Sequence, residues 1–316
     1  MLIWFTNIEP FFLPNSNVLI CRIYITEILS YIQIESYKPM KKICAITMAR
    51  NDEFFLNRWI EYYGKQLGEK NLYVYLDGED QSMPQKAGKV NVRHCSRVAK
   101  SVVKAEKHRL GFLSEKAAEL LQEYDMVIGV DADEFLVVDP RCNKTLVEYL
   151  SDISVRTCVS GLGLDVGQNM NTEKQLDENE LFLLQRNYAL LSARYTKPSV
   201  ISQPVRWGSG FHRVKGRNFK IDPNLYLLHF GSVDMEMIRQ RFLDKDRMAT
   251  GREKHIKKRA RTIDIITKKN AKENESWLKV ARIIQTCIRP VYALNKPSMG
   301  RWKLVVRIPE RFKTIC

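Results

Sequence analysis

One stretch of the sequence decides the fold: Met126-Val127-Ile128-Gly129-Val130-Asp131-Ala132-Asp133-Glu134-Phe135-Leu136. Its first five residues are apolar or small, which predicts a short strand buried on both faces. In the extended backbone that follows, Asp131 and Asp133 point to the same side, because side-chain direction repeats every two residues. Two such carboxylates repel each other unless a cation lies between them, and their oxygens suit Mg²⁺ or Mn²⁺. The alternative interpretation is an acidic turn that caps the next segment.

Strand and helix patterns alternate on both sides of this stretch. Apolar runs predict the strands, and apolar residues at helical spacing predict the helices between them. The predicted strands cover 43–48, 72–76, 89–93, 126–130, 157–164 and 225–231, and the predicted helices cover 53–63, 101–124 and 145–150. This alternation is typical of an α/β protein with a mostly parallel sheet and flanking helices.

Acidic turns end three of the predicted strands. The first turn holds Asn51 and Asp52, the second holds Asp77, and the third holds Asp131 and Asp133. Parallel strands place their carboxyl ends along one edge of a sheet, so we expect the three turns to converge on one crevice. The first turn has neither the glycine-rich dinucleotide pattern nor a phosphate-loop pattern, which disfavours both of those nucleotide sites.

Four positions in the second half of the chain carry candidate chemistry. Asp165 follows the strand 157–164, and His229 lies inside the apolar run 225–231. Trp207 precedes a loop of Gly and Ser residues that ends at His212, and such a loop lets the backbone approach a ligand. Trp207 either offers an apolar face to a sugar ring or a base, or packs in the core. His229 is a hydrogen-bonded core residue unless it reaches the edge of the sheet.

Positive charge is concentrated at the C-terminal end. The net charge is +15, and residues 235–316 hold 22 Lys and Arg against 8 Asp and Glu. The densest run, residues 254–261, is either a solvated helix face or a contact for anionic lipid headgroups or a phosphorylated acceptor. Aromatic residues are too sparse here to stack on single-stranded nucleic acid, so a nucleic-acid partner is not expected. We therefore divide the chain into an N-terminal extension (1–39), a body (40–234) and a basic, mainly helical region (235–316).

The cysteines and the N-terminal residues bear on where the protein resides. The seven cysteines are scattered and include no closely spaced pair, which fits a reducing compartment rather than a disulfide framework or a zinc site. We expect translation to start at Met40, because two lysines and the first predicted strand follow it at once. The alternative is that residues 1–39 associate with a membrane or pack on the body. A tryptic peptide from residues 1–39 of the native protein would contradict the later start.

Five short motifs together resemble bacterial family 2 glycosyltransferases. They are Thr-Met-Ala-Arg-Asn-Asp-Glu at 47–53, Asp-Ala-Asp-Glu-Phe-Leu at 131–136, Tyr-Thr-Lys-Pro at 195–198, Pro-Val-Arg-Trp-Gly-Ser-Gly-Phe-His at 204–212 and Leu-Leu-His-Phe at 227–230. The resemblance is to the subgroup of the GT-A fold in which the Asp-x-Asp metal motif runs into Glu-Phe-Leu. It covers about residues 40–247 and rests on the order and spacing of the motifs.

The resemblance implies a nucleotide-diphosphate sugar donor and a Mn²⁺ or Mg²⁺ ion that bridges its diphosphate. It also implies two sets of binding residues. The nucleotide-sugar set is Asn51, Asp52, Asp77 and Asp131, to which we add Trp207, and the metal set is Asp131, Asp133 and His229, with Asp133 the direct ligand. The family commonly inverts the sugar, which requires a base on the face opposite the leaving group. We expect Asp165 to be this base, with His212 as the second candidate.

The sequence departs from the family at two points. The turn Asp77-Gly78-Glu79-Asp80 lacks the paired aspartates frequent in family 2, so the nucleotide stays open. The usual Glu-Asp motif for the base is not evident either, which weakens the assignment of Asp165.

These features predict a metal-dependent glycosyltransferase for cell-surface polysaccharide or lipopolysaccharide assembly, with a glycan or lipid-linked acceptor. We expect a cytoplasmic protein whose basic region rests on the inner membrane. A sugar nucleotidyltransferase is the first alternative, disfavoured because such enzymes begin with a glycine-rich, basic phosphate loop. The second is a non-catalytic scaffold that binds membrane or nucleic acid through residues 239–272, and its polyanion binding would survive loss of Asp131 and Asp133.

Overall fold

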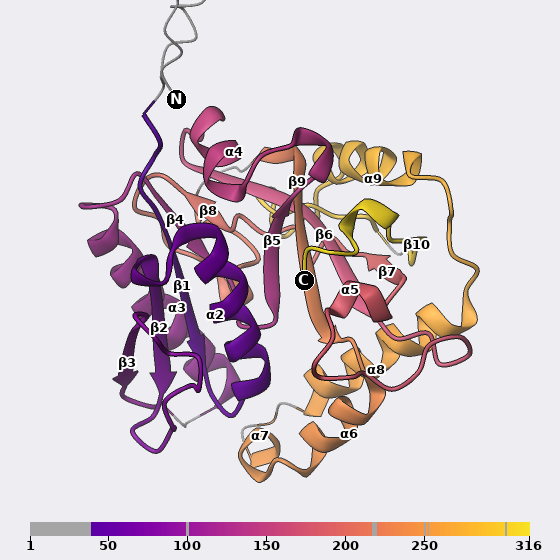
Figure 1. The fold of residues 1–316 in the computed structure, drawn as a ribbon, viewed down its shortest axis with the longest axis horizontal. Helices are drawn as coiled ribbons and strands as arrows, with labels where there is room; N and C mark the ends of the chain where they lie inside the picture. Colours follow the sequence, from indigo (N-terminus) through magenta and orange to yellow (C-terminus); the bar gives the residue numbers. More distant parts are fainter. Residues whose placement is uncertain (1–38, 99–100, 217–219, 250, 252, 301) are drawn as a thin grey trace, which may run out of the picture. The chain divides into compact units, whose positions relative to one another are not determined.

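The computed structural model describes residues 39–316 except 99–100, 217–219, 250, 252 and 301. Contacts within the chain divide it into two units, residues 1–39 and residues 40–316, and every element named below belongs to the second unit (Figure 1). The predictions made for residues 1–38 lie outside the described residues. No helix in the described part is long and apolar enough to cross a membrane.

The described residues form one mixed sheet of ten strands flanked by helices. The strands are β1 (Ile43–Ala49), β2 (Leu72–Asp77), β3 (Asn91–Cys95), β4 (Met126–Gly129), β5 (Glu134–Val138), β6 (Cys158–Gly167), β7 (Tyr188–Leu191), β8 (Val200–Ile201), β9 (Lys220–Ser232) and β10 (Val305–Arg307). The α-helices are α2 (Glu53–Leu67), α3 (Val102–Leu120), α4 (Leu146–Asp152), α5 (Phe182–Gln185), α6 (Met235–Leu243), α7 (Lys245–Ala249), α8 (Glu253–Lys268) and α9 (Ser276–Cys287). Short 3₁₀ turns occur at η1 (Glu69–Asn71), η2 (Pro140–Cys142), η3 (Ser209–Phe211) and η4 (Glu310–Phe312).

The sheet is parallel in one half and largely antiparallel in the other. Strands β3, β2, β1 and β4 lie side by side in that order and run parallel, with α2 and α3 as crossovers. Beyond β4 the pairs β4–β8, β6–β8, β6–β7, β7–β10 and β5–β9 are antiparallel, and only β6–β9 is parallel. The α/β class is therefore confirmed, whereas the expectation of a mostly parallel sheet holds for the first half alone.

Alternation along β1 explains how the parallel half is covered on both faces. Ile43 and Ala45 join the core cluster that contains the apolar residues of α2. Cys44 and Ile46, which point the other way, join the cluster that contains Leu110 and other apolar residues of α3. A strand buried on both faces needs a continuous apolar run, and β1 is buried along its whole length.

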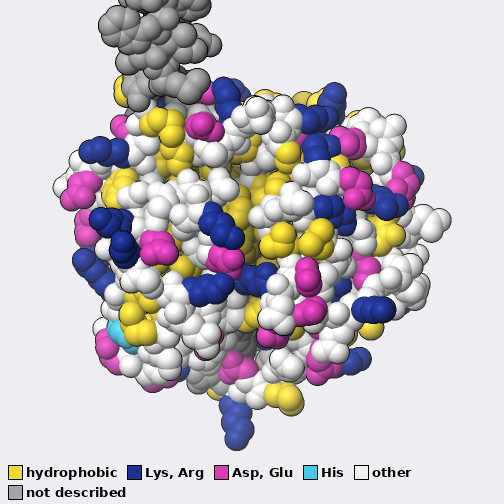
Figure 2. Space-filling model, viewed as in Figure 1, with side chains coloured by type: hydrophobic (Ala, Val, Ile, Leu, Met, Phe, Trp, Pro, Cys, Tyr) yellow, Lys and Arg dark blue, Asp and Glu magenta, His cyan; other side chains and the backbone are white. Residues whose placement is uncertain are grey.

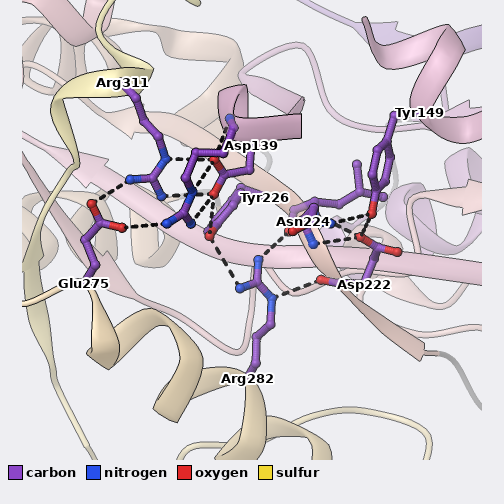
Figure 3. A network of polar contacts seen from close by, with 10 residues as sticks. Asp139, Tyr149, Asp222, Asn224, Tyr226, Glu275, Arg282 and Arg311 are labelled. Carbon is purple, nitrogen blue, oxygen red and sulfur yellow. Dashed lines mark hydrogen bonds and ion pairs between the residues drawn. The ribbon is translucent and has the colours of Figure 1, made fainter. Parts of the chain in front are cut away.

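The C-terminal region is mainly helical and is built into the same sheet. Strand β10 pairs with β7, and Phe312 and Cys316 belong to the main hydrophobic core. A polar network fixes this end of the chain, because Arg311 donates two hydrogen bonds to the carboxylate of Asp139 and a third to Glu275 (Figure 3). Whether residue 234 marks a domain boundary stays a prediction.

Candidate functional site

The acidic stretch lies where three neighbouring strands meet. Strand β9 runs between β5 and β6, and the register places His229 opposite Glu134 on one side and opposite Asp165 on the other. The turn that joins β4 to β5 holds Asp131 and Asp133 at the same place. Four carboxylates and one imidazole from three segments of the sequence are therefore brought together.

His229 is held between two of these carboxylates. Its Nδ1 lies 2.7 Å from Asp165 Oδ1, and its Nε2 lies 3.5 Å from Asp133 Oδ2. The ring of Tyr195 stacks on the imidazole, with the ring centroids 3.8 Å apart. Burial opposes a positive charge on the ring, but Asp133 and Asp165 outweigh burial and raise the pKa of His229 to about 9. The imidazole is thus fixed in both position and orientation.

Close packing against β6 sets the place of Tyr195. The amide of Gly163 donates a hydrogen bond to Thr196 Oγ1 at 2.9 Å. A Cβ atom at Gly163 would lie only 2.3 Å from the carbonyl carbon of Tyr195, so a side chain there would push the segment away. Because Gly163 of β6 has no side chain, the Tyr-Thr-Lys-Pro segment can approach the acidic residues.

Asp165 is committed to His229 and to α8. Its Oδ2 accepts a hydrogen bond from Thr262 Oγ1 at 3.0 Å, while its Oδ1 faces His229. The residue is only 5% exposed, which leaves little surface for an acceptor hydroxyl. A carboxylate that binds the second nitrogen of an imidazole is the arrangement by which proteins orient metal-binding histidines. The geometry suits an orienting role for Asp165 better than the expected role of base.

Asp133 pairs with a cation from the basic C-terminal region. Arg259 on α8 donates a hydrogen bond from Nη2 to Asp133 Oδ2 at 2.6 Å. Burial disfavours the charged carboxylate, but Arg259 and His229 outweigh burial and hold the pKa of Asp133 well below its usual range. One residue of the basic run 254–261 thus turns inward, and the candidate site draws on both sides of residue 234.

Asp131 and Glu134 share the buried side chain of Lys197. Its Nζ lies 3.1 Å from Asp131 Oδ2 and also contacts Glu134 Oε1. Arg109 donates a further hydrogen bond to Asp131 Oδ1 at 2.8 Å. Burial raises the pKa of Glu134 to about 7 although Lys197 opposes this, whereas Lys197 and Arg109 outweigh burial at Asp131 and keep its pKa well below the usual range. The pKa values of two neighbouring acids are therefore shifted in opposite directions.

A pocket of about 440 Å³ adjoins Asp131 at the carboxyl ends of β1, β2 and β3. Its wall contains apolar, cationic and acidic side chains, including Met48, Tyr75, Phe112, Arg93, His94, His108, Arg109, Lys116 and Asp77. Tyr75 and Phe112 meet edge to face, with ring centroids 4.9 Å apart. Arg109 lines the pocket and also binds Asp131, so this one side chain joins the pocket to the acidic residues. A pocket of this volume accommodates a ligand of nucleoside size.

The three acidic turns converge only in part. Asp77 lies on the wall of the larger pocket, whose Arg109 donates a hydrogen bond to Asp131. Asn51 instead accepts a hydrogen bond from Gln81 Nε2 at 2.9 Å, and Asp52 pairs with Arg241 at 3.1 Å. These two residues line a second, smaller pocket of about 210 Å³ between α2 and α6. The structure therefore places Asn51 and Asp52 apart from the pocket that contains Asp77.

Trp207 lies in the core. It is 2% exposed and packs on β4, where a Cβ atom at Gly129 would come within 2.7 Å of the indole ring. Its Nε1 donates a hydrogen bond to the carbonyl of Pro198 at 3.0 Å. Of the two interpretations of Trp207, core packing is the one that matches this geometry, because the ring has no open face for a sugar or a base.

His212 is fixed as a neutral imidazole at the edge of the same region. Its Nδ1 lies 2.8 Å from the carbonyl oxygen of Arg194. A carbonyl can only accept, so Nδ1 carries the proton and Nε2 is the unprotonated nitrogen. Burial, followed by the charges of Lys197 and Lys296, lowers the pKa of His212 well below its usual value. The ring is therefore uncharged at pH 7.

The residues around His229 fit a divalent cation. With Nδ1 bound to Asp165, Nε2 is directed at Asp133; the carboxylate oxygen suits Mn²⁺ or Mg²⁺, whereas the imidazole nitrogen suits a transition-metal ion such as Mn²⁺ better than Mg²⁺. In the part of the chain that the structure describes, no three His, Cys, Asp or Glu side chains already form a metal site. A cation held by Asp133 and His229 would thus take its remaining ligands from a substrate or water, as Mg²⁺ usually does. Asp131, the other acid of the motif, is paired with Arg109 and Lys197, as Asp133 is paired with Arg259.

Sequence reasoning missed the cations of this site. Lys197 stands in the Tyr-Thr-Lys-Pro motif, where a lysine close to the apolar pair Val200-Ile201 was the available signal. Arg109 occupies an ordinary position in a helix, and nothing in the sequence singles it out. Arg259 has basic neighbours on both sides, so its inward direction could not be read from composition.

A search of models of protein families and a search of curated proteins found no match to the chain. The candidate site therefore rests on the geometry and chemistry of the residues described above.

Proposed function

We propose that the chain is a metal-dependent glycosyltransferase that moves a sugar from a nucleoside-diphosphate donor to a glycan or lipid-linked acceptor. The observation that carries the proposal is the junction, through Arg109, of a nucleoside-sized pocket with a buried acidic cluster. The GT-A architecture, the similarity to bacterial family 2 and a cytoplasmic role in cell-surface glycan assembly are parts of the same proposal.

The pocket supplies the contacts that a nucleoside diphosphate needs. Met48 and Phe112 offer apolar surface to the base, and the carboxylate of Asp77 accepts hydrogen bonds from the ribose hydroxyls. Arg109 and Lys116 attract the phosphates, and Arg109 carries this attraction to the side of Asp131. Phosphate oxygens match the planar guanidinium particularly well.

The acidic residues prepare a cation site next to the phosphates. A Mn²⁺ or Mg²⁺ ion held by Asp133 and His229 would neutralise the negative charge that develops on the leaving diphosphate. Asp165 orients His229, Tyr195 holds the ring in place, and Arg259 keeps Asp133 ionised until a ligand arrives. Each of these residues thus positions another residue of the site.

The transfer exchanges one bond for another and moves one proton. The bond between the anomeric carbon and the diphosphate oxygen breaks, the bond to the acceptor oxygen forms, and the acceptor proton passes to a base. His212 is the better base of the two expected candidates, because its Nε2 is unprotonated while both oxygens of Asp165 are occupied. With inversion, this base lies on the face opposite the leaving group.

Thermal unfolding with a panel of nucleotide sugars, with and without Mn²⁺, tests the proposal. A ligand that binds only the native state raises the melting temperature by mass action. We expect one class of nucleotide to raise it in the presence of Mn²⁺, and Asp133→Asn to remove the Mn²⁺-dependent part. Asp264→Asn is the matched control, because Asp264 is an exposed acid on α8 that pairs with the exposed Lys268.

Two outcomes would replace the proposal. Release of pyrophosphate from a nucleoside triphosphate and a sugar phosphate would establish a nucleotidyltransferase instead. Salt-sensitive binding to polyanions that Asp133→Asn leaves intact, with no response to any nucleotide, would establish a basic scaffold.

A further inference from the structure

A surface outside the pocket and the acidic cluster lies at the end of α9 and in the segment that follows it. Thirteen large hydrophobic residues are exposed in the described chain, and seven of them lie between Val280 and Trp302. Exposed hydrophobic residues that occur singly are ordinary, whereas a contiguous group marks an interaction site.

Helix α9 has apolar residues on its buried face and also on its outer face. Leu278 and Ala281 are buried in the main core, on the face that packs toward the sheet. Val280, Ile283 and Cys287 are exposed and recur every three or four residues, so they form one outward stripe. The outer side of a surface helix is normally polar, whereas α9 combines this apolar stripe with the exposed polar residues Ser276, Lys279 and Thr286.

The outward stripe continues into a closed loop. The amide of Ser298 donates a hydrogen bond to the carbonyl of Ile288 at 3.0 Å, which brings the end of the loop back to the end of α9. At the tip, Val291 is 97%, Tyr292 78% and Leu294 71% exposed, and Trp302 follows at 61%. We call the following six residues the apolar rim: Ile283, Ile288, Val291, Tyr292, Leu294 and Trp302.

A group of cations adjoins the base of this loop. Lys296 lies in the loop, and its neighbour Asn295 donates a hydrogen bond to the carbonyl of Val214 at 2.5 Å. Arg213 precedes Val214, and the carbonyl of Arg194 binds the nearby His212. Lys258 comes from α8, one residue before the inward-facing Arg259. We call Arg194, Arg213, Lys258 and Lys296 the basic cluster.

The basic cluster has no counter-ions among the described residues. No described carboxylate forms an ion pair with any of its four members, although ion pairs are frequent elsewhere. Burial lowers the pKa of Lys296, and the charges of Arg194 and Arg213 lower it further. The charge of Arg194 is the main cause of the lowered pKa of Lys258. Mutual repulsion of this kind is relieved when anions bind.

We propose that the apolar rim and the basic cluster form one docking surface for an anionic lipid bilayer. Tyr and Trp favour the boundary between headgroups and acyl chains, and apolar side chains beside them insert to a shallow depth. Lys and Arg next to such a group bind the phosphates of anionic lipids. On the face shown in Figure 2, by contrast, Lys and Arg alternate with Asp and Glu, so the surplus of positive charge is not gathered there.

A bilayer fits this surface better than a second copy of the chain does. Two copies joined symmetrically through the apolar rim would bring their basic clusters together, and like charges across an interface oppose association. An anionic bilayer complements both parts of the surface at once. Lys197 and His212 lie within electrostatic reach of Lys296, so docking would bring lipid headgroups to the candidate site; this last step alone rests on the proposed function.

Co-sedimentation of the full chain with lipid vesicles tests the docking surface. We expect binding to vesicles of phosphatidylcholine with phosphatidylglycerol, little binding to phosphatidylcholine alone, and weakening at high salt. Val291→Asp with Leu294→Asp should weaken binding by roughly tenfold or more, because charged groups cannot enter the boundary region. Leu243→Asp, at a residue of α6 that is 79% exposed, is the matched control and should bind as the native chain does.

A second variant tests the basic cluster. Arg194→Gln with Lys258→Gln should also weaken binding by about tenfold, since each cation near an anionic surface contributes to the attraction. Circular dichroism and the melting temperature verify that the variants fold, which we expect because the substituted residues are exposed.

Three results would overturn the proposal. The first is undiminished vesicle binding by the loop-tip variant, and the second is a dimer in light scattering that this variant abolishes. The third is complete competition by inorganic phosphate, which would indicate an anion site without a bilayer. Nucleotide-induced thermal shifts on the same samples separate the two proposals, because vesicle binding without any nucleotide response would refute the proposed function alone.

Discussion

Strand β5 has a buried aspartate at each end, and the two ends are built differently. Asp139, directly after the strand, accepts hydrogen bonds from the guanidinium groups of Arg141 and Arg311, with Glu275 beyond Arg311 (Figure 3). Asp133, directly before the strand, accepts from Arg259 but lies among other carboxylates, and its nearest imidazole is shared with Asp165.

We interpret the network at Asp139 as one that stabilises the fold, and the network at Asp133 as one arranged to bind a ligand. At Asp139 two arginines, which also pair with Glu275, outweigh burial and lower the pKa of the buried acid. At the other end the pKa of Glu134 rises to about 7 and that of His229 to about 9, while the pKa of Asp133 falls. Groups whose surroundings move their pKa values apart are typical of sites that bind or transfer charge.

Substitution at Asp133 should produce the largest functional effect. We expect Asp133→Asn to lower metal-dependent transfer by about 10²–10³-fold, the scale of losing one group that stabilises a developing charge. The free energy of unfolding should also fall, because the variant leaves the guanidinium of Arg259 and the imidazole of His229 without their charged partner. Steady-state rates and urea unfolding measure the two quantities. A loss of stability without a loss of transfer would make Asp133 a structural residue.

Substitution at Asp139 should lower stability and leave the nucleotide response intact. Asp139→Asn leaves two arginines facing a weaker partner in a site where the side chain is 2% exposed, and we expect a loss of about 3 kcal/mol in the free energy of unfolding. Nucleotide with Mn²⁺ should still raise the melting temperature of this variant, starting from its lower value. If the nucleotide response disappeared in folded protein, the contrast between the two ends of β5 would fail.

Substitution of Arg259 tests whether the arginine at the Asp133 end of β5 can be displaced by a metal ion. Arg259→Gln removes one positive charge that competes with a metal ion for Asp133, so we expect Mn²⁺ to bind about tenfold more tightly. Isothermal titration calorimetry measures this affinity in the absence of nucleotide. Arg261→Gln, an exposed position on the same helix, is the control. Weaker Mn²⁺ binding would mean that Arg259 helps to form the cation site.

The smallest expected effect is the loss of stability at acid pH, which we assign to Asp139. The pKa of Asp139 is lower in the folded protein than its usual value of about 4. Its contribution to stability is therefore complete above that usual value and is lost as the pH falls toward the folded-state pKa. Asp139→Asn should flatten this part of the curve of stability against pH, as measured by urea unfolding between pH 5 and about pH 3. An unchanged slope would assign the acid sensitivity to other carboxylates.

Sequence patterns predicted the elements whose signal is long and periodic. The run 126–130 and its acidic turn, the strand of β1 and the helix 101–124 all appear close to their predicted positions. The two-residue β8 and three-residue β10 are too short to have a period, so the antiparallel half of the sheet was not anticipated. Strand β5 was not predicted as a separate element, because its apolar residues directly follow the acidic turn after the run 126–130.

The candidate site was predicted as a set of positions but not as a set of contacts. Asp77, Asp131, Asp133, Asp165 and His229 lie at strand ends or in register, which sheet geometry allows one to infer. Their partners come from helices and loops far along the chain, and spacing says nothing of such contacts. Trp207 shows the same limit, because an aromatic residue beside a glycine loop has one sequence pattern whether it faces a ligand or the core.

Helix α8 has a consequence for when the protein becomes competent during its synthesis. The helix supplies Arg259 to Asp133 and Thr262 to Asp165, yet it follows the acidic turn by more than a hundred residues. A chain still on the ribosome would hold four carboxylates in its growing sheet with part of their neutralising partners unmade. The acidic centre therefore reaches its final form only after α8 has been synthesised, and an N-terminal fragment that ends before residue 253 should lack it.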